Sequence, residues 1–208
     1  MARILLIRHA VADHTGKRLY GRSQGVALSE RGRADAEGLA ERLRRVRIHG
    51  LYVSPMQRCR ETAETIARGR RLEPEILEDL NEVDYGDWTG RTFASLRRTK
   101  VWRQVRTRPS TARFPNGESL LEVQERAVRA IEGIARRHRR GVAAVVTHGD
   151  VIRLALAHYA GLHLDLFQRL EASTASVTAL ALGDGIPRVL RANDTGRLED
   201  LVPGKVGG

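Results

Sequence analysis

The chain has 208 residues, of which 41% are apolar and 29% are charged, a composition close to that of ordinary globular domains. At about 150 residues per domain, this length predicts one domain over residues 1–208, with a loosely ordered tail at 200–208. The early apolar run at residues 4–7 is too short for a membrane span of about 20 residues or for a signal-peptide core. The single cysteine, Cys59, excludes an internal disulfide framework, so we expect a cytoplasmic location and no membrane partner.

The sequence is strongly basic, with 36 Lys and Arg against 25 Asp and Glu, a net charge of +11. Such a charge favours anionic partners, including nucleic acids and phosphorylated metabolites. The arginines, however, come in separate runs at residues 42–47, 68–71 and 136–140, each at the expected end of a helix, where cations complement the helix dipole. Aromatic residues make up only 4% of the chain. We therefore expect a small phosphorylated partner and no nucleic acid.

The first predicted elements alternate between strand and helix. Residues 3–8 form an apolar run that ends abruptly in charge, which is typical of a strand buried on both faces of a parallel sheet. Ser29 can cap a helix whose apolar residues recur at helical spacing up to Val46. Residues 51–53 predict a second short strand. The helix is therefore expected to cover one face of a sheet.

A second helix start is predicted directly after residue 53. Ser54, Pro55 and Gln57 have the spacing of an N-cap, a proline at the first helical position and a capping-box glutamine. Cys59 then lies on the apolar stripe of this helix. That position favours a packed thiol over a nucleophile.

The middle of the chain is less regular. Residues 75–77 predict a short strand, and residues 96–105 predict a helix within a region that otherwise has a loop-like composition. Ser119 and Glu122 have the spacing of a capping box at the start of a long helix, which ends before Gly141.

The last predicted elements complete an alternating pattern. Residues 142–147 predict another strand buried on both faces, and Asp150 is expected to cap a helix that ends near Tyr159. Strands are expected at residues 176–182 and 187–191. Strands alternating with helices at this spacing predict an α/β fold, a three-layer α/β/α sandwich with a mainly parallel central sheet.

Two histidines follow predicted strands directly, His9 after residues 3–8 and His148 after residues 142–147. In open α/β sheets, ligands bind at the carboxyl edge of the strands. If both strands are central and parallel, the two imidazoles share one crevice with Arg8, and Arg58 joins them from the first turn of its helix. A histidine at a strand end is more often a hydrogen-bonded structural residue, so the position alone leaves both interpretations open.

A series of segments, taken in order, resembles the motifs of the histidine phosphatase superfamily, the phosphoglycerate-mutase-like phosphatases. They are LIRHA at 6–10, SERG at 29–32, SPMQRCRETA at 54–63, NEVDYGDWTG at 81–90, FPNGES at 114–119 and THG at 147–149. The resemblance runs from about residue 3 to about residue 200, and motifs in the correct order are far more specific than any one of them. The segments at 166–169 and 193–196 are most similar to an actinobacterial-type subgroup described as phosphomutases.

The resemblance implies a phosphoglycerate mutase-like fold and a catalytic set of five residues. His9 is the implied nucleophile, since a neutral imidazole attacks phosphorus near neutral pH without a strong base. Arg8, Arg58 and His148 would neutralise the charge on the phosphoryl oxygens, because phosphoryl transfer depends mostly on positioning and electrostatics. Glu82 is the implied general acid. This scheme requires no metal and no cofactor.

The sequence departs from the family pattern around the nucleophile. Ala10 replaces the usual glycine, and Ala12 and Thr15 stand where relatives often have serine and asparagine. Two side-chain contacts to phosphate are therefore expected to be absent or relocated. Beyond Arg8, Arg58 and His148, the residues that we expect to bind substrate are Thr15, Gly21, Arg22, Ser23 and Gly149.

The function that these residues favour is a metal-independent phosphatase. It would hydrolyse small phosphomonoesters through a phosphohistidine on His9 and release inorganic phosphate. The segment at 114–119 favours this interpretation over a phosphoglycerate-type phosphomutase, which would use the same residues. A catalytically weak phosphate-binding relative and a homodimer remain open alternatives.

Overall fold

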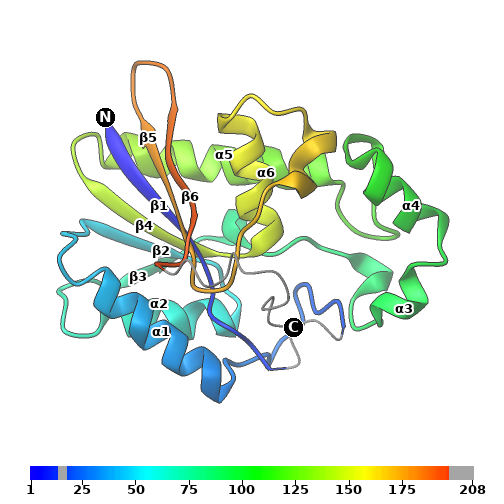
Figure 1. Ribbon diagram of the computed structural model, residues 1–208, viewed down its shortest axis with the longest axis horizontal. Helices are drawn as coiled ribbons and strands as arrows, with labels where there is room; N and C mark the ends of the chain where they lie inside the picture. Colours follow the sequence, from blue (N-terminus) through cyan, green and yellow to red (C-terminus); the bar gives the residue numbers. More distant parts are fainter. Residues whose placement is uncertain (14–17, 197–208) are drawn as a thin grey trace.

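A six-stranded sheet forms the centre of the computed structural model, which describes residues 1–13 and 18–196 (Figure 1). The order of the strands is β3-β2-β4-β1-β5-β6. The first four are mutually parallel, whereas β5 is antiparallel to β1 and β6 is antiparallel to β5. The strands are β1 (Ala2–Arg8), β2 (Gly50–Val53), β3 (Pro74–Ile76), β4 (Val142–Thr147), β5 (Val177–Leu182) and β6 (Arg188–Asp194).

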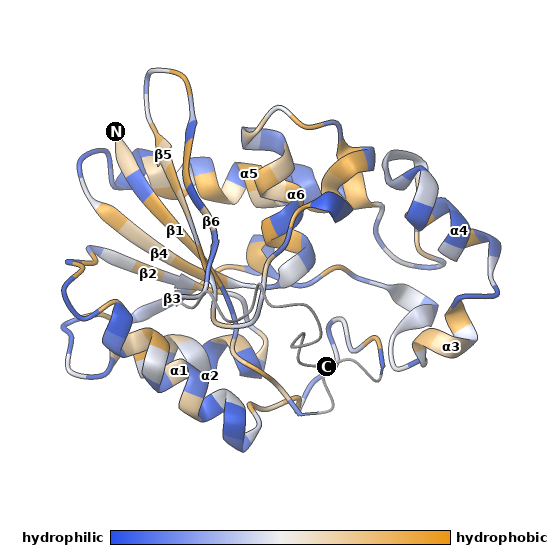
Figure 2. Cartoon of the chain, in the orientation of Figure 1, coloured by the Kyte–Doolittle hydropathy of each residue, from blue (hydrophilic) through white to orange (hydrophobic). Residues whose placement is uncertain are grey.

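Two pairs of helices cover the two faces of the sheet (Figure 1). On one face α1 (Glu30–Arg42) and α2 (Gln57–Ala67) enclose an apolar cluster with the strands, and on the other α5 (Leu120–Arg137) and α6 (Gly149–Tyr159) border a second one. Apolar residues concentrate on the strands and on the inward sides of the helices (Figure 2). The three-layer α/β/α sandwich with a mainly parallel sheet is therefore confirmed.

Short helices lie beyond the carboxyl edge of the sheet. The helix expected at residues 96–105 is two helices, α3 (Phe93–Leu96) and α4 (Lys100–Thr107). The reason is a second cap, since the Thr99 side chain accepts a hydrogen bond from the Trp102 amide and starts α4 anew. The 3-10 segments are η1 (Glu78–Leu80), η2 (Gly86–Trp88), η3 (Pro109–Thr111) and η4 (Leu164–Arg169).

Two of the predicted helix starts are confirmed and two are wrong. Ser29 caps α1, and Ser119 and Glu122 form the predicted capping box of α5. In contrast, α2 has Met56 as its N-cap without a side-chain hydrogen bond, and the hydroxyl of Ser54 lies 2.7 Å from His148 Nε2 while accepting a longer hydrogen bond of 3.4 Å from the Met56 amide. Asp150 is not a cap either. It lies inside the first turn of α6, and its carboxylate accepts a hydrogen bond from the hydroxyl of Tyr85.

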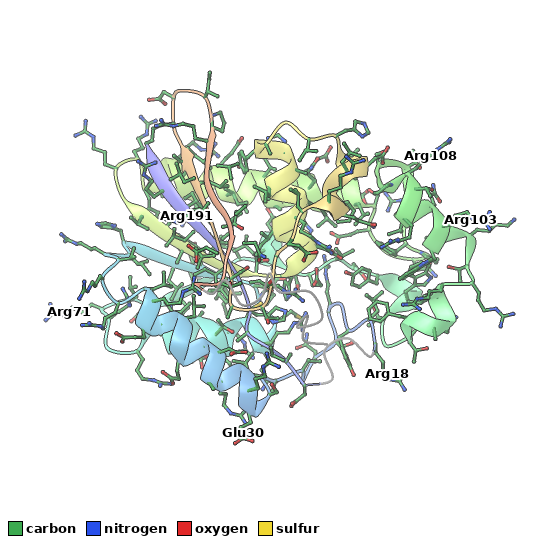
Figure 3. All side chains as sticks on the ribbon, in the orientation of Figure 1. Arg18, Glu30, Arg71, Arg103, Arg108 and Arg191 are labelled. Carbon is green, nitrogen blue, oxygen red and sulfur yellow. The ribbon has the colours of Figure 1, made fainter. Side chains whose placement is uncertain are left out.

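The labelled side chains of Arg18, Arg71, Arg103 and Arg191 come from different segments of the chain and lie far apart in Figure 3. The arginine-rich runs also begin near the ends of α1, α2 and α5, as predicted. Within the described part of the chain, no helix has the length and apolar character that a bilayer span requires.

Candidate active site

The register of the two central strands brings the two histidines together. Arg8 of β1 is the partner of Thr147 of β4, so the next residue of each strand, His9 and His148, reaches the same edge of the sheet. The centroids of the two imidazole rings are 5.3 Å apart, in an edge-to-face arrangement. A cavity of about 260 Å³ opens here, and the lining includes His9, Arg58 and Glu82.

His9 is held as a neutral imidazole whose Nε2 lone pair accepts a hydrogen bond from Arg58. Its Nδ1 lies 2.8 Å from the carbonyl oxygen of Ala10, which can only accept, so Nδ1 carries the proton. Nε2 is then the acceptor, and Arg58 Nε donates to it at 3.2 Å. Burial, followed by the charges of Arg58 and Arg8, lowers the pKa of His9 well below 6.5. Nε2 is therefore available as a nucleophile at neutral pH.

The buried guanidinium of Arg58 and the partly buried guanidinium of Arg8 line the same cavity. Arg8 Nη1 donates to the carbonyl oxygen of Ala172 at 2.7 Å, and Arg58 Nη2 donates to that of Gly21 at 2.8 Å. Arg8 Nε and Arg58 Nη1 are also buried, yet they have no hydrogen-bond acceptor among the described residues. Buried donors are rarely left unpaired, and charged ones suit the oxygens of an anion. The cavity thus has the donors that a phosphoryl group would need.

His148 lies fully buried behind the two arginines. Its Nε2 is 2.7 Å from the hydroxyl oxygen of Ser54, and its Nδ1 is 3.2 Å from Arg58 Nη2. Cys59 Sγ is 3.5 Å from the same Nε2. Burial, followed by the charges of Arg58 and His9, lowers the pKa of His148 well below 6.5. This imidazole is therefore neutral at neutral pH, and His148 is not among the residues that line the cavity.

Glu82 is the carboxyl group nearest to the second histidine. Its Oε2 is 3.7 Å from His148 Nδ1, and its Oε1 accepts a hydrogen bond from the amide of Val83 at 2.9 Å. Burial raises the pKa of Glu82 to about 7, and the nearby carboxylate of Asp150 acts in the same direction. A carboxyl group that holds its proton near neutral pH can act as a general acid.

Residues of the motifs at 29–32 and 54–63 fix the loop that follows His9. The amide of Ala10 donates to the hydroxyl of Thr62, and the amide of Leu28 donates to the carboxylate of Glu61. Gly32, at the start of α1, packs directly against the carbonyl oxygen of Val11, which would lie 1.8 Å from an added Cβ. A larger residue in place of Gly32 would displace this loop.

The positions near His9 at which this sequence differs from the family pattern, Ala10, Ala12 and Thr15, lie in different surroundings. The methyl group of Ala10 packs in the apolar cluster under α1 and α2, and its φ angle is not positive, so the position does not require glycine. Ala12 contributes to the cavity wall. Thr15 lies outside the described residues, so its expected contact with substrate remains a prediction.

The remaining residues expected to bind substrate lie in two groups. Gly21 and Gly149 line the cavity, and Gly149 approaches the guanidinium of Arg8 so closely that an added Cβ would lie 3.2 Å from its Cζ. Arg22 and Ser23 are not among the lining residues. The guanidinium of Arg22 instead donates to the carbonyl oxygen of Glu82 at 2.9 Å.

Several residues near the cavity were not foreseen from the sequence. Asp150 and Arg153 form an ion pair on its wall, and Tyr85 donates its hydroxyl proton to Asp150. Ser54 was predicted as a cap and instead contacts His148. The spacing of Asp150 and Arg153, three residues apart on a helix, is the one signal that could have indicated their pairing. Across residues 1–13 and 18–196, no three His, Cys, Asp or Glu side chains are arranged to hold a metal ion.

Comparison with known proteins places this geometry in a family. A family model described as the histidine phosphatase superfamily (branch 1) matches residues 4–195. Phosphoserine phosphatase 1 of Hydrogenobacter thermophilus is 29% identical over 206 residues, which cover 97% of this chain and 96% of that protein. Phosphoglycerate mutase-like protein 4 of Arabidopsis thaliana is 32% identical over 157 residues, which cover 73% of this chain and 68% of the relative.

The comparison extends to solved structures. The structure of YhfR from Bacillus stearothermophilus matches with a TM-score of 0.88 at 29% identity, covering 93% of this chain and 98% of that one. Three mycobacterial relatives are longer, and the matched region spans 55% of their length. The likeness therefore covers almost all of this chain, in sequence and in fold.

Proposed function

Because this chain belongs to the histidine phosphatase superfamily, we propose that it hydrolyses small phosphomonoesters through a phosphohistidine on His9, without a metal ion or cofactor. The observation that carries the proposal is the pairing of a neutral His9 Nε2 with two guanidinium groups that keep buried donors unpaired. A nucleophile and the charges that stabilise a phosphoryl group are thereby present in one cavity.

In the first step, His9 Nε2 attacks the phosphorus atom in line with the leaving oxygen. The nitrogen–phosphorus bond forms as the phosphorus–oxygen bond breaks, and the carboxyl group of Glu82 gives its proton to the departing alkoxide. Arg8 and Arg58 neutralise the charge on the other phosphoryl oxygens, and the neutral imidazole of His148 supports this group by accepting a hydrogen bond from Arg58 Nη2. Arg58 Nε, which binds Nε2 of His9 without substrate, can donate to a phosphoryl oxygen instead.

In the second step, water attacks the phosphohistidine. Glu82, now a carboxylate, takes a proton from this water as the new phosphorus–oxygen bond forms and the nitrogen–phosphorus bond breaks. Inorganic phosphate leaves, while Glu82 and His9 return to their starting states. The raised pKa of Glu82, about 7, supports a group that both gives and takes a proton near neutral pH.

The substrate class that we propose is a small phosphorylated metabolite. A relative that matches nearly the whole chain is named phosphoserine phosphatase 1, and the cavity of about 260 Å³ suits a ligand of that size. A phosphomutase is the second candidate, because another relative is named phosphoglycerate mutase-like. We further propose a cytoplasmic location, which the single buried cysteine supports.

The test is hydrolysis of an aryl phosphate in the presence of EDTA by the native enzyme and by His9→Ala. Activity should persist in EDTA and should vanish in His9→Ala, while the exposed His158→Ala serves as the matched control. A rapid acid-free quench should trap a phosphoprotein that is stable to base and labile to acid. Activity that survives the loss of His9 would remove it from the role of nucleophile. Product analysis with and without a bisphosphate primer separates phosphatase from mutase.

A further inference from the structure

The proposed general acid stands on a segment with little regular structure. Glu82 lies between the short turns η1 and η2, so the strand and helix hydrogen bonds that fix His9 and His148 are absent around it. The backbone of residues 79–84 must therefore be held from outside. Asp84 is the first residue of this stretch with a backbone hydrogen bond to the 114–118 segment, since its carbonyl oxygen accepts from the amide of Glu118 at 2.9 Å.

One buried arginine on α5 supplies the contacts that the earlier part of the segment needs. Arg126 Nη1 donates to the carbonyl oxygens of Asp79 at 2.8 Å and Asn81 at 2.7 Å, and Nη2 donates to that of Glu82 at 3.1 Å. The residue is only 7% exposed. Three carbonyl oxygens within four residues of the acid-bearing segment thus accept from a single planar group, while the hydroxyl of Thr147 and the guanidinium of Arg22 donate to those of Leu80 and Glu82.

The other side of this guanidinium is fixed by a carboxylate. Glu118 accepts from Arg126 Nε at 2.8 Å and from Nη2 at 3.0 Å, a two-point contact that sets the plane of the guanidinium. Glu118 also accepts from the amide of Asp84 at 2.9 Å. Burial opposes its negative charge, yet the hydrogen bonds from Arg126 and Asp84 hold the pKa of Glu118 below its usual value. All five guanidinium protons of Arg126 thereby have acceptors.

We propose that Arg126, oriented by Glu118, is a positioning residue that places the carboxyl group of Glu82 for proton transfer to the leaving group. The inference rests on the proposed function, in which Glu82 is the general acid. Arg126 holds the backbone of this segment through hydrogen bonds to Asp79, Asn81 and Glu82, and among the described residues no hydrogen bond joins it to His9, Arg8 or Arg58. Its loss should therefore impair protonation of the leaving group and leave the binding of the phosphoryl group intact.

Leaving-group chemistry separates this role from general damage to the fold. A nitrophenolate leaves without help, whereas an alkoxide needs a proton from the acid. The ratio of kcat/KM for p-nitrophenyl phosphate to kcat/KM for glycerol 2-phosphate therefore reports on Glu82. An inactive, misfolded fraction lowers both values equally and cancels from the ratio.

The variants are Arg126→Gln, Arg126→Lys and Glu118→Gln, each compared with Glu82→Gln. Arg129→Gln is the matched control, because Arg129 lies one turn further along α5 and reaches only the exposed carboxylate of Asp79 at 3.4 Å. We expect Arg126→Gln to raise the ratio by about tenfold, less than the roughly 10²–10⁴-fold that a general acid contributes, because the variant displaces the acid and does not remove it. Arg126→Lys should give a smaller rise, since an ammonium cannot span all four acceptor groups. Arg129→Gln should leave the ratio unchanged.

Combining variants tests whether Arg126 acts through Glu82. In the Glu82→Gln background, Arg126→Gln should change the ratio little further, and the inhibition constant of inorganic phosphate should stay within about threefold of native. If Arg126→Gln does not fold, Arg126→Lys and Glu118→Gln supply the same measurements.

Two outcomes contradict different statements. An unchanged ratio in Glu82→Gln would overturn the acid role of Glu82 in the proposed function. A raised ratio in Glu82→Gln, together with unchanged ratios in the Arg126 and Glu118 variants, would overturn the positioning role alone.

Discussion

The protonation of Glu82 should set the pH range in which this enzyme cleaves poor leaving groups. Burial raises the pKa of Glu82 to about 7, and burial together with Arg58 lowers the pKa of His9 well below 6.5. A raised carboxyl pKa means that the acid stays protonated up to about pH 7, and a lowered histidine pKa means that the nucleophile stays neutral there. The active form is therefore most populated between the two pKa values, and kcat/KM for an alkyl phosphate should fall about tenfold per pH unit above pH 7.

The assay is kcat/KM for glycerol 2-phosphate and p-nitrophenyl phosphate from pH 5 to pH 9. The substrate phosphate itself titrates near pH 6, so Glu82→Gln with the same substrates is the control that isolates the enzyme group. Asp150 raises the pKa of Glu82, so Asp150→Asn should move the fall in rate to lower pH. The reasoning is refuted if native enzyme shows no fall above pH 7 with the alkyl substrate, or if the same fall persists in Glu82→Gln.

Three further predictions concern the surroundings of the two histidines. Ser54→Ala removes the hydrogen-bond partner of buried His148 Nε2, so the free energy of unfolding should drop by about 1–3 kcal/mol, measured by urea titration, with Ser95→Ala at an exposed position of α3 as control. Gly149→Ala puts a methyl group 3.2 Å from Arg8 Cζ, so the inhibition constant of inorganic phosphate should rise about tenfold; unchanged inhibition would contradict a role for Arg8 in binding phosphate. Burial raises the pKa of the Cys59 thiol to about 12. A maleimide should therefore label the native protein slowly at pH 8 and the urea-unfolded protein quickly. Rapid labelling of the native protein would contradict the interpretation of Cys59 as a packed thiol.

The sequence was sufficient to predict the features that depend on local patterns and on strand register. The apolar runs at β1 and β4 indicated two buried parallel strands, and that arrangement alone brings His9 and His148 to one edge. The capping box at Ser119 is equally local, because both of its partners lie within one turn. These predictions hold because each depends only on residues that are close in the sequence or on residues paired between two adjacent strands.

The features that were missed depend on tertiary contacts. Ser54 has the spacing of a helix cap, but its hydroxyl lies against His148, a residue 94 positions away that follows strand β4. Helical spacing places Arg126 beside the apolar stripe of α5 and Arg129 further round the helix, but spacing does not show what a buried guanidinium would bind. The packing of residues 79–84 against α5 supplies the carbonyl acceptors that make Arg126 a buried anchor, and it leaves Arg129 exposed. Those acceptors come from a distant part of the chain, so they could not be read from the helix pattern.

The two halves of the site are therefore supported in different ways. The strand register of β1 and β4 fixes His9 and His148, and α2 brings Arg58 to them, so the phosphoryl half is part of the core. Glu82 stands on an irregular segment whose carbonyl oxygens are held by Arg126. Because the supports are separate, variants that disturb one half should leave the other half working. Gly149→Ala should weaken phosphate binding for every substrate. Arg126→Gln should leave phosphate binding unchanged and slow only the hydrolysis of esters whose leaving group needs a proton.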